Sequence, residues 1–384
     1  MEVFDDQLLN QQDFSVSVQR ALTGGGVVLP YSGWLGHDNV GDEIVFGLLC
    51  HLLQRALDAN RAPLFRDVKL PHLLEEFDWS PIKAAVLGGG STIDKFYIRP
   101  IVPALEAGLP IFCFAAGFQN DFDLIEDERR MIGLLSGARF GSVRGTATKQ
   151  VLEQIAGPSP LEVIVDGGFL APLFYPPAPP PPGPLPRMAI NLLDLEYARA
   201  PVLELMAAYK HAFEFVLLPF DPPTLAGLAE LRAAAPADCR VHLETDFTNY
   251  TTLLSWYAAS DLSLNMKLHA SVLSSAVGTP PLGWGGGRKM DEYFSSIGSD
   301  AFRIRSFEVD ELQQAVERVK HQKPNYAISM QALLGKTFQA HLSTVESFLH
   351  GAGLTSALAA PGGAVQVTGI RAIDCGFILL TRAG

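Results

Sequence analysis

Residues 261–282, DLSLNMKLHASVLSSAVGTPPL, predict a buried strand that passes directly into a helix. Leu262 and Leu264 alternate with polar residues, as they would in a buried strand. From Leu268 onward, apolar residues recur at helical spacing until Gly278 stops the helix. Because strand-to-helix corners are the repeating joint of α/β folds, this stretch indicates the fold class.

Lys267 and His269 lie at this corner. Backbone N–H groups and the positive end of the helix dipole favour an anion there. The lysine adds a positive charge, and the histidine can move a proton near neutral pH. The alternative is a helix that happens to begin with a cation and a half-buried histidine. For His269, the order of the other motifs along the chain favours function.

The composition limits the possible partners. The chain has 384 residues, more than one ordinary core, so two domains are expected. Its 48% hydrophobic and 18% charged residues are typical of a well-packed globular protein. A net charge of −12 without any basic block argues against a nucleic-acid partner. A small anionic ligand stays possible because two or three local cations can hold it.

The cysteines and the hydropathy indicate a compartment. The four cysteines are scattered without a CxxC pair, which predicts no thiolate zinc site and suits a reducing cytoplasm. Nothing in the sequence requires a metal. The opening residues MEVFDDQLLNQQDF are acidic and polar, unlike a signal peptide. Since no apolar run approaches the ~18 residues that span a bilayer, we expect a soluble cytoplasmic protein without a transmembrane segment.

Residues 1–175 are expected to form an N-terminal Rossmann-like domain. A strand at 27–30 leads into the loop 33–43, GWLGHDNVGDE, and then into a helix. Strand, glycine-marked loop and helix open a doubly wound sheet, in which ligands bind at the carboxyl ends of the strands. The loop matches neither GxGxxG nor the GK[ST] of a P-loop, which excludes both nucleotide fingerprints.

Two further segments of this domain are candidates for ligand contact. A buried strand at 84–87 ends in three glycines, including Gly89 and Gly90, which let a backbone approach a ligand or turn sharply. A strand at 140–144 ends in Arg144, which faces the start of the next helix. For Arg144, a structural ion pair is the alternative to a ligand contact.

Residues 176–187 include the proline-rich run PPAPPPPGPLP, which predicts a semi-rigid linker. A second βα series over 188–325 predicts a C-terminal Rossmann-like domain, and two such domains would enclose a ligand cleft. Residues 326–358 predict a terminal helix packing across the domains, and the Gly/Ala-rich tail 359–384 is expected to be poorly ordered.

In the second domain, strands are expected at 188–192, 213–218, 240–243, 261–265, 280–283 and 301–304, and helices around 200–211, 223–235, 249–259, 268–277, 290–297 and 308–320.

The order of these segments resembles the polysaccharide pyruvyl transferase family. Members typically show G-x-x-G-x-x-N-x-G-D-E, then a GGG turn, then VR-x-x-x-S/T, which read here GWLGHDNVGDE, VLGGGST and VRGTAT. The family's Arg-Leu-His-Ala motif, followed by small residues, reads KLHASVLSSA, and Lys289 precedes a helix that ends in glycine. The resemblance spans roughly residues 27–298, and its most specific parts are 39–43 and 267–270.

The resemblance implies an α/β fold of two Rossmann-like domains in a glycosyltransferase-B-like arrangement with an interdomain cleft. It also implies an enzyme that moves the pyruvate unit of phosphoenolpyruvate onto two hydroxyls of a sugar or glycan-lipid precursor, giving a ketal and phosphate, as in exopolysaccharide biosynthesis. Phosphoenolpyruvate is the donor substrate, and no cofactor is implied. One departure is Lys267 in place of the family's arginine, which keeps the charge but loses the planar two-bond grip on an anion. Another is Gly145, where family members often carry an acidic residue.

The resemblance also assigns roles to residues. His269 is the expected proton shuttle, and Lys267 is the expected catalytic cation. The donor anion is assigned to Arg144, Lys267, His269 and, secondarily, Lys289. The acceptor is assigned to His37, Asn39, Asp42, Glu43, Gly89 and Gly90. The alternatives are that Asn39, Asp42 and Glu43 only cap and shape the loop, and that Lys289 is a solvent lysine.

Two rival functions stay open. A glycosyltransferase-B-type enzyme using a nucleotide-sugar would need a ribose- or pyrophosphate-binding motif, and Glu244–Asn249, ETDFTN, is the one weak candidate. A non-catalytic carbohydrate-binding homologue is favoured by the lysine at position 267, and fold alone cannot decide between these. The acceptor sugar, the ketal position and stereochemistry, and the oligomeric state, a homo-oligomer included, stay open.

Overall fold

The computed structural model divides the chain into two compact units. Unit 1 combines the residues up to Gly167 with those from Phe338 onward, and unit 2 runs from Gly168 to Thr337. The structure describes residues 9–58, 60–71, 73–74, 77–118, 126–178, 183–193, 195–358 and 364–382.

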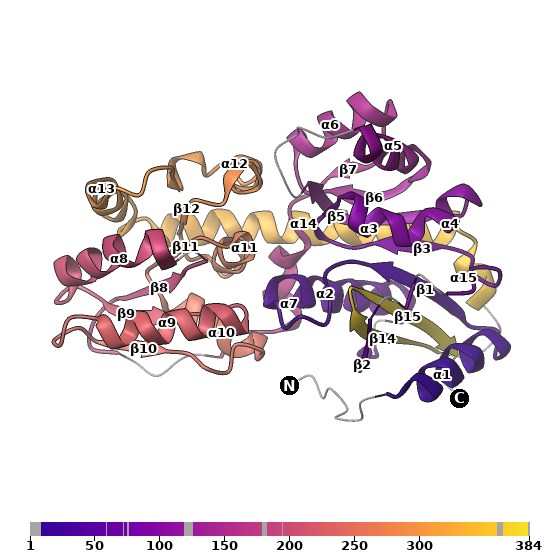
Figure 1. Ribbon diagram of the computed structural model, residues 1–384, viewed down its shortest axis with the longest axis horizontal. Helices are drawn as coiled ribbons and strands as arrows, with labels where there is room; N and C mark the ends of the chain where they lie inside the picture. The colour runs from indigo at the N-terminus through magenta and orange to yellow at the C-terminus, as the bar shows by residue number, and fades with distance from the viewer. Residues whose placement is uncertain are drawn as a thin grey trace. The chain divides into compact units, whose positions relative to one another are not determined.

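Unit 1 alternates strands and helices, and the C-terminal part of the chain returns to it (Figure 1). Its N-terminal part contains α1 (Gln11–Thr23), β1 (Val27–Ser32), α2 (Val40–Leu57), β2 (Leu64–Pro71), β3 (Ala85–Leu87), β4 (Gly90–Ile93), α3 (Lys95–Ile98), η1 (Arg99–Ile101), α4 (Val102–Glu106), β5 (Ile111–Phe118), α5 (Glu126–Leu134), η2 (Leu135–Gly137), β6 (Phe140–Val143), α6 (Thr146–Ala156) and β7 (Glu162–Val163). Its C-terminal part contains the end of α14 (Lys323–Gly351), α15 (Leu354–Leu358), β14 (Val365–Ile373) and β15 (Cys375–Arg382).

The sheet of unit 1 is mostly parallel, as the sequence predicts. Over the described residues it has nine strands, in the order β2-β14-β15-β1-β3-β5-β6-β7, with β4 paired to β5. Strands β1, β3, β5, β6 and β7 form a parallel series. Only β15, among these described strands, pairs antiparallel with its neighbours, β1 and β14. The carboxyl ends of the parallel strands therefore share one edge, where the loop after β1 begins.

The C-terminal tail contradicts the sequence prediction. Instead of being poorly ordered, Val365–Arg382 forms the hairpin β14–β15 inside the sheet, between β2 and β1. Figure 1 shows these yellow strands beside the indigo β1. Residues 359–363 and 383–384 of the predicted tail lie outside the described residues.

Packing on both faces explains why the tail is ordered. Phe377 lies in one apolar cluster with Phe14 of α1. On the other face, a Cβ at Gly369 would lie 3.1 Å from the Phe46 ring of α2. A strand buried on both faces reads as a continuous apolar run, and CGFILL is such a run. The nearby glycines thus mark close packing of helix and sheet, not a flexible segment.

Unit 2 is a regular βα series (Figure 1). After η3 (Gly167–Leu170), its elements are α7 (Ala171–Phe174), β8 (Arg187–Asn191), α8 (Leu195–Tyr209), β9 (Glu214–Leu217), α9 (Pro222–Ala234), β10 (Val241–Leu243), α10 (Tyr250–Ala259), β11 (Leu262–Asn265), α11 (Leu268–Ala276), β12 (Pro281–Trp284), α12 (Gly287–Ser296), η4 (Asp300–Phe302), β13 (Arg303–Ile304), α13 (Val309–Val319) and the start of α14. These bounds confirm all six predicted strands and all six predicted helices, with small shifts at their ends.

The strand order of unit 2 is that of a Rossmann fold. Its described residues form six strands in the order β10-β9-β8-β11-β12-β13, with every pairing parallel. Numbered from β8, this is the order 3-2-1-4-5-6. The order reverses between β8 and β11, and in such sheets ligands bind beyond the carboxyl ends of the two strands at this switch point.

The boundary between the units lies earlier than predicted. Residues 168–175 belong to unit 2 and not to the N-terminal domain. The Tyr175 ring lies 5.2 Å from that of Tyr250 in α10, and the Ala178 N–H donates to Ser255 Oγ at 2.8 Å. These contacts fix the start of the proline run to unit 2, and residues 179–182 of the run lie outside the described residues. In the described part of the chain, no helix is both long and apolar enough to cross a membrane.

Candidate functional site

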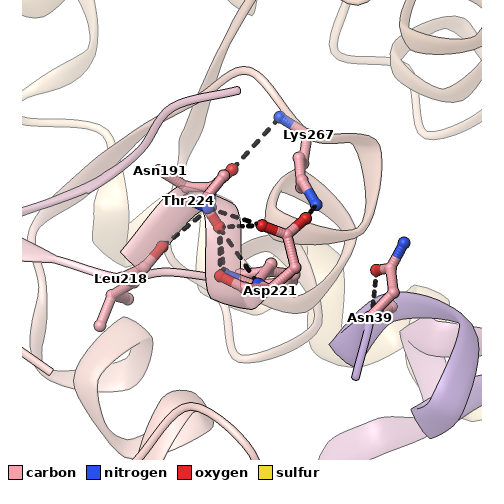
Figure 2. Close-up of polar contacts among 8 residues, drawn as sticks. Asn39, Asn191, Leu218, Asp221, Thr224 and Lys267 are labelled. Atoms are coloured by element: carbon pink, nitrogen blue, oxygen red, sulfur yellow. Dashed lines mark hydrogen bonds and ion pairs between the residues drawn. The ribbon is translucent and has the colours of Figure 1, made fainter. Parts of the chain in front are cut away.

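The switch point of unit 2 carries Lys267. Strands β8 and β11 end side by side at Asn191 and Asn265. Asn191 Oδ1 accepts a hydrogen bond from the Lys267 N–H at 3.3 Å, and its Nδ2 donates to the Leu218 carbonyl at 2.8 Å. The buried Asn191 amide thus ties the corner before α11 to the end of β9 (Figure 2). The predicted strand-to-helix corner is present, at the position where a doubly wound sheet binds its ligand.

An ion pair that the sequence analysis does not anticipate joins Lys267 to Asp221. Lys267 Nζ donates to Asp221 Oδ2, and both side chains are mostly buried. Asp221 follows β9 and caps α9, accepting the Thr224 N–H at 2.8 Å in a capping box (Figure 2). Burial raises the pKa of Asp221, but the hydrogen bonds from Lys267 and Thr224 outweigh it, so its pKa is lowered overall. The cation therefore already faces a carboxylate.

His269 is the second residue of α11, and its side chain is partly exposed. Lys267 is the N-cap residue, and its own side chain makes no capping hydrogen bond to this helix. Backbone N–H groups in the first turn of a helix have no partner within the helix. The corner thus combines these donors, the helix dipole, a lysine and a histidine, which is the chemistry needed to bind an anion and move a proton.

A glycine loop approaches the same corner. Gly285, Gly286 and Gly287 have φ of 68°, 77° and 59°, a left-handed conformation that favours glycine at all three. A Cβ on Gly286 would lie 3.2 Å from the Met266 carbonyl oxygen, so the loop passes close to the residue before Lys267. The loop leads into α12, where Lys289 is partly exposed.

In unit 1, Glu43 anchors the loop after β1 from within the protein. The side chain is buried; Oε1 accepts the Gly36 N–H at 2.7 Å, and Oε2 accepts from Arg371 Nη1 at 3.2 Å. Arg371 also donates twice to Asp67, at 2.7 and 2.8 Å. Burial raises the pKa of Glu43 to about 7, against the lowering effects of Arg371 and the Gly36 N–H. These contacts support the loop-shaping alternative, and acceptor binding by Glu43 stays a prediction.

His37 also contacts the C-terminal hairpin. His37 Nε2 lies 2.8 Å from Asp374 Oδ1, and the imidazole stacks on Trp34 with ring centroids 3.8 Å apart. Asp374 has φ of 64° in the turn between β14 and β15, and its N–H donates to the Leu35 carbonyl at 3.0 Å. The hairpin and the loop therefore hold each other in place.

Asn39 and Asp42 lie where this loop enters α2. Asn39 is the N-cap residue, and its Oδ1 accepts the Gly41 N–H at 3.3 Å (Figure 2). Asp42 is partly exposed. After burial, the charge of Asp42 is the next largest cause of the raised pKa of Tyr31 and of Tyr97. Asn39 thus has the predicted turn-holding role, and Asp42 is the more accessible carboxylate of the motif.

Gly89 and Gly90 are required by the packing of the protein itself. A Cβ on Gly89 would lie 2.3 Å from Val45 Cγ1 and 2.9 Å from the Phe114 carbonyl oxygen. Gly90 has φ of 82°. The close approach predicted for these glycines is therefore to other residues of the protein, and contact with an acceptor stays a prediction.

Arg144 is buried in unit 1. Its Nη2 donates to the Phe118 carbonyl at 2.9 Å and to Ser91 Oγ at 3.2 Å. A Cβ on Gly117 would lie 2.2 Å from Arg144 Nε, so the guanidinium fills the space that this glycine leaves. The side chain holds two strand ends together, which supports the structural alternative. Lys267, His269 and Lys289 belong to unit 2, so the candidates for the donor site do not all lie in one unit.

Asp221, Arg371 and Asp374 are the neighbours of candidate residues that the sequence analysis misses. Asp221 lies three residues after the expected strand 213–218 and precedes Pro-Pro, a helix-start signal. This position places it at the ligand-binding edge of the sheet. Arg371 and Asp374 have no comparable signal, because they lie in the segment predicted to be poorly ordered. Among the residues that the structure describes, no group of three or more His, Cys, Asp or Glu could hold a metal ion.

Comparisons with known proteins identify a family and a fold. The family model described as polysaccharide pyruvyl transferase matches residues 39–284. Among curated proteins, none matches the chain. A UDP-GlcNAc 2-epimerase from Neisseria meningitidis bound to UDP-GlcNAc is 12% identical, with a TM-score of 0.50 over 78% of this chain and 96% of that one.

Two further solved structures are similar to the chain. The MnaA–UDP structure from S. aureus is 12% identical, with a TM-score of 0.55 over 79% of this chain and 94% of that one. A UDP-N-acetylglucosamine 2-epimerase is 13% identical, with a TM-score of 0.55 over 85% and 96%. At this identity the similarity concerns the fold, and it confirms the predicted class of two Rossmann-like, glycosyltransferase-B-type domains.

Proposed function

The chain belongs to the polysaccharide pyruvyl transferase family, and on this basis we propose that it transfers the pyruvate unit of phosphoenolpyruvate to two hydroxyls of one sugar. The products are a cyclic pyruvate ketal and inorganic phosphate. The observation that carries the proposal is the Lys267–His269 corner at the switch point of a Rossmann sheet. Phosphoenolpyruvate carries a carboxylate and a phosphate, the groups that a lysine and a helix N-terminus bind.

The reaction is balanced without an oxidant or an added water. C3 of phosphoenolpyruvate takes a proton, C2 becomes an oxocarbenium-like centre, and the first sugar hydroxyl bonds to C2 and gives up its proton. The C2–O bond to phosphate then breaks, the second hydroxyl bonds to C2, and its proton leaves with the phosphate. His269 is proposed to carry these protons, because an imidazole at the start of α11 can serve as acid and then as base.

Lys267 is proposed to stabilise the negative charge of the departing phosphate. Lys267 pairs with Asp221 in this structure, so the donor anion would either displace the Asp221 carboxylate or share the lysine ammonium with it. Lys289 remains the proposed secondary cation. The four cysteines are free thiols, which supports the proposed cytoplasmic location, and phosphoenolpyruvate serves as donor substrate without a further cofactor.

The nucleotide-sugar alternative depended on Glu244–Asn249. Glu244 Oε1 accepts the Thr245 and Asp246 N–H groups, each at 2.8 Å. Glu244 Oε2 accepts from Trp256 Nε1 at 2.7 Å. Because this carboxylate already accepts three hydrogen bonds within the protein, it is a poor candidate for binding a ribose.

Donor binding tests the proposal directly. We expect millimolar phosphoenolpyruvate to raise the melting temperature of the wild type and of Lys267→Arg, but not of Lys267→Gln. Lys336→Gln is the matched control, because it removes the same charge from an exposed position in α14. Stabilisation by nucleotide-sugars alone would favour the glycosyltransferase. Glycan binding without binding of any donor would favour the non-catalytic alternative.

A further inference from the structure

Unit 1 contains a pocket of about 470 Å³ that no assigned role uses. Its walls come from α3, η1 and α5 and from the turn between β14 and β15. Helix α3 follows β4, and α5 is the next helix after β5, so the pocket lies at the carboxyl edge of the parallel strands. This is the edge at which α/β sheets bind ligands, and the volume is within the usual range for ligand pockets.

Cations are the first feature of this pocket. Lys95, Arg99 and Arg130 line it. Lys95 Nζ pairs with Glu128 at 3.1 Å. Within the described chain, by contrast, no ion pair or side-chain hydrogen bond engages Arg99 or Arg130. Two arginines without an internal counterion, beside a cavity in a chain of net charge −12, indicate an anionic ligand.

The remaining lining suits a sugar. The Phe96 side chain is 47% exposed, and its ring is held edge-on against Tyr97 with centroids 5.1 Å apart. Phe96 thus offers an exposed apolar ring at the wall of the pocket. Asp127 and Asp374 supply carboxylates that can accept bonds from hydroxyls, and His37 holds Asp374 in place at 2.8 Å.

We infer that this pocket binds the acceptor as a sugar phosphate. Arg99 and Arg130 bind the phosphate, and Phe96 packs against the sugar ring. Asp127 and Asp374 accept hydrogen bonds from the sugar hydroxyls. The inference rests on the proposed function in naming the ligand as the acceptor. It also explains the C-terminal hairpin, which lies outside the residues 39–284 shared with the family model and supplies Asp374 to both the pocket and His37.

The test is a calorimetric titration of the full chain, without phosphoenolpyruvate, with hexose 1-phosphate, the free hexose and inorganic phosphate. We expect hexose 1-phosphate to bind at least about tenfold more tightly than either fragment. Arg99→Gln and Arg130→Gln should each weaken it by about tenfold. Arg139→Gln is the matched control, since Arg139 is exposed, lies just before β6 and is not part of the pocket.

Three results would overturn the inference: equal binding of hexose and hexose 1-phosphate, equal binding of inorganic phosphate, or arginine variants that bind like the control. The proposed function fails separately. If hexose 1-phosphate binds as expected but no acceptor elicits phosphate release from phosphoenolpyruvate, the pocket stands and pyruvyl transfer falls. If phosphate release occurs but the arginine variants do not change the acceptor's KM, pyruvyl transfer stands and this pocket is not its acceptor site.

Discussion

If Lys267 binds the donor as proposed, its ion pair with Asp221 sets how strongly it can attract that anion. The carboxylate caps α9 and at the same time binds the lysine ammonium. A donor carboxylate or phosphate must compete with Asp221 for that charge.

Asp221→Asn isolates this effect, because asparagine is an equally good N-cap residue and keeps α9 intact. With the negative charge removed, we expect phosphoenolpyruvate to bind about fivefold more tightly, or about 1 kcal/mol. The measurement is the dissociation constant by titration calorimetry, with Asp238→Asn, at an exposed ion pair with Lys210, as the control. Unchanged or weaker binding would show that Asp221 positions the lysine instead of competing for it.

At this scale, sequence reasoning finds residues and misses their partners. Lys267 and His269 are found because a strand-to-helix corner is a local pattern of about ten residues. The pairing of Lys267 with Asp221 joins two βα units 46 residues apart, and no local pattern encodes such a distance. For Glu43 and Arg144, the residue type is compatible with a ligand contact and with a structural contact. Only the folded structure shows that both side chains are buried and which protein groups they contact.

The loop 33–43 and the hairpin β14–β15 form one structural element. Glu43, His37 and the Leu35 carbonyl each contact the hairpin. The most specific N-terminal motif of the family is therefore held by the last strands of the chain.

Arg371→Gln should loosen this element. It leaves the buried Glu43 carboxyl without its cation, so the pKa of Glu43 should rise further, and we expect a loss of about 2–3 kcal/mol of unfolding free energy. Chemical denaturation at pH 7 measures it, with Arg382→Gln at the end of β15 as the control. If the two variants were equally stable, the Glu43–Arg371–Asp67 network would not hold the loop.

Helix α14 carries a buried histidine that makes stability depend on pH. His341 Nε2 bonds the Val165 carbonyl at 2.9 Å, and burial lowers the pKa of His341 to about 4. The unfolded chain takes up a proton near pH 6.5 and the folded chain does not, so stability falls as pH drops from about 6.5 toward 4. Between pH 7 and pH 5 this histidine should cost about 2 kcal/mol. Glu43, with its raised pKa, acts in the opposite direction: its contribution is fully present below about pH 4.5 and is lost as pH rises through 7.

His341→Gln should therefore lose less stability than the wild type on acidification from pH 7 to pH 5. Thermal unfolding at a series of pH values measures the difference, and Glu43 cancels because both proteins contain it. His350→Gln, an exposed position on the same helix, should follow the wild-type profile. Parallel profiles for His341→Gln and the wild type would mean that the pKa of His341 is the same in the folded and the unfolded protein.

Over the whole molecule, the strands and helices of the second Rossmann-like unit are predicted correctly from its sequence, although the unit begins before residue 188 and extends beyond residue 325. The first unit is predicted only in part. Unit 2 is built from consecutive βα units, so each strand and helix is visible as a local period. The sheet of unit 1 is completed by strands 300 residues away from β2 in sequence, with Thr368 paired to Leu64. These two strands lie in a Gly/Ala-rich sequence, and they are buried only when the complete sheet has formed. A local sequence pattern therefore does not predict them.

A truncated chain that ends at Leu358 tests how much β14 and β15 contribute to the stability of unit 1. It removes β14 and β15, which lie between β2 and β1, and exposes Phe14, Phe46 and the inner edges of the sheet. We expect aggregation and loss of a cooperative melting transition. A chain that ends at Arg382 should behave like the full-length protein. Cooperative melting of the shorter chain at the wild-type temperature would contradict the role given to the hairpin.

Phosphate release from phosphoenolpyruvate in the presence of a panel of sugar acceptors is the most direct test of the central claim. We predict acceptor-dependent release by the wild type and a loss of about 10²-fold or more in kcat for His269→Ala. His242→Ala, at an exposed histidine in β10, should behave like the wild type. Release that persists in His269→Ala would remove the histidine from the mechanism, and no release with any acceptor, despite bound phosphoenolpyruvate, would contradict pyruvyl transfer.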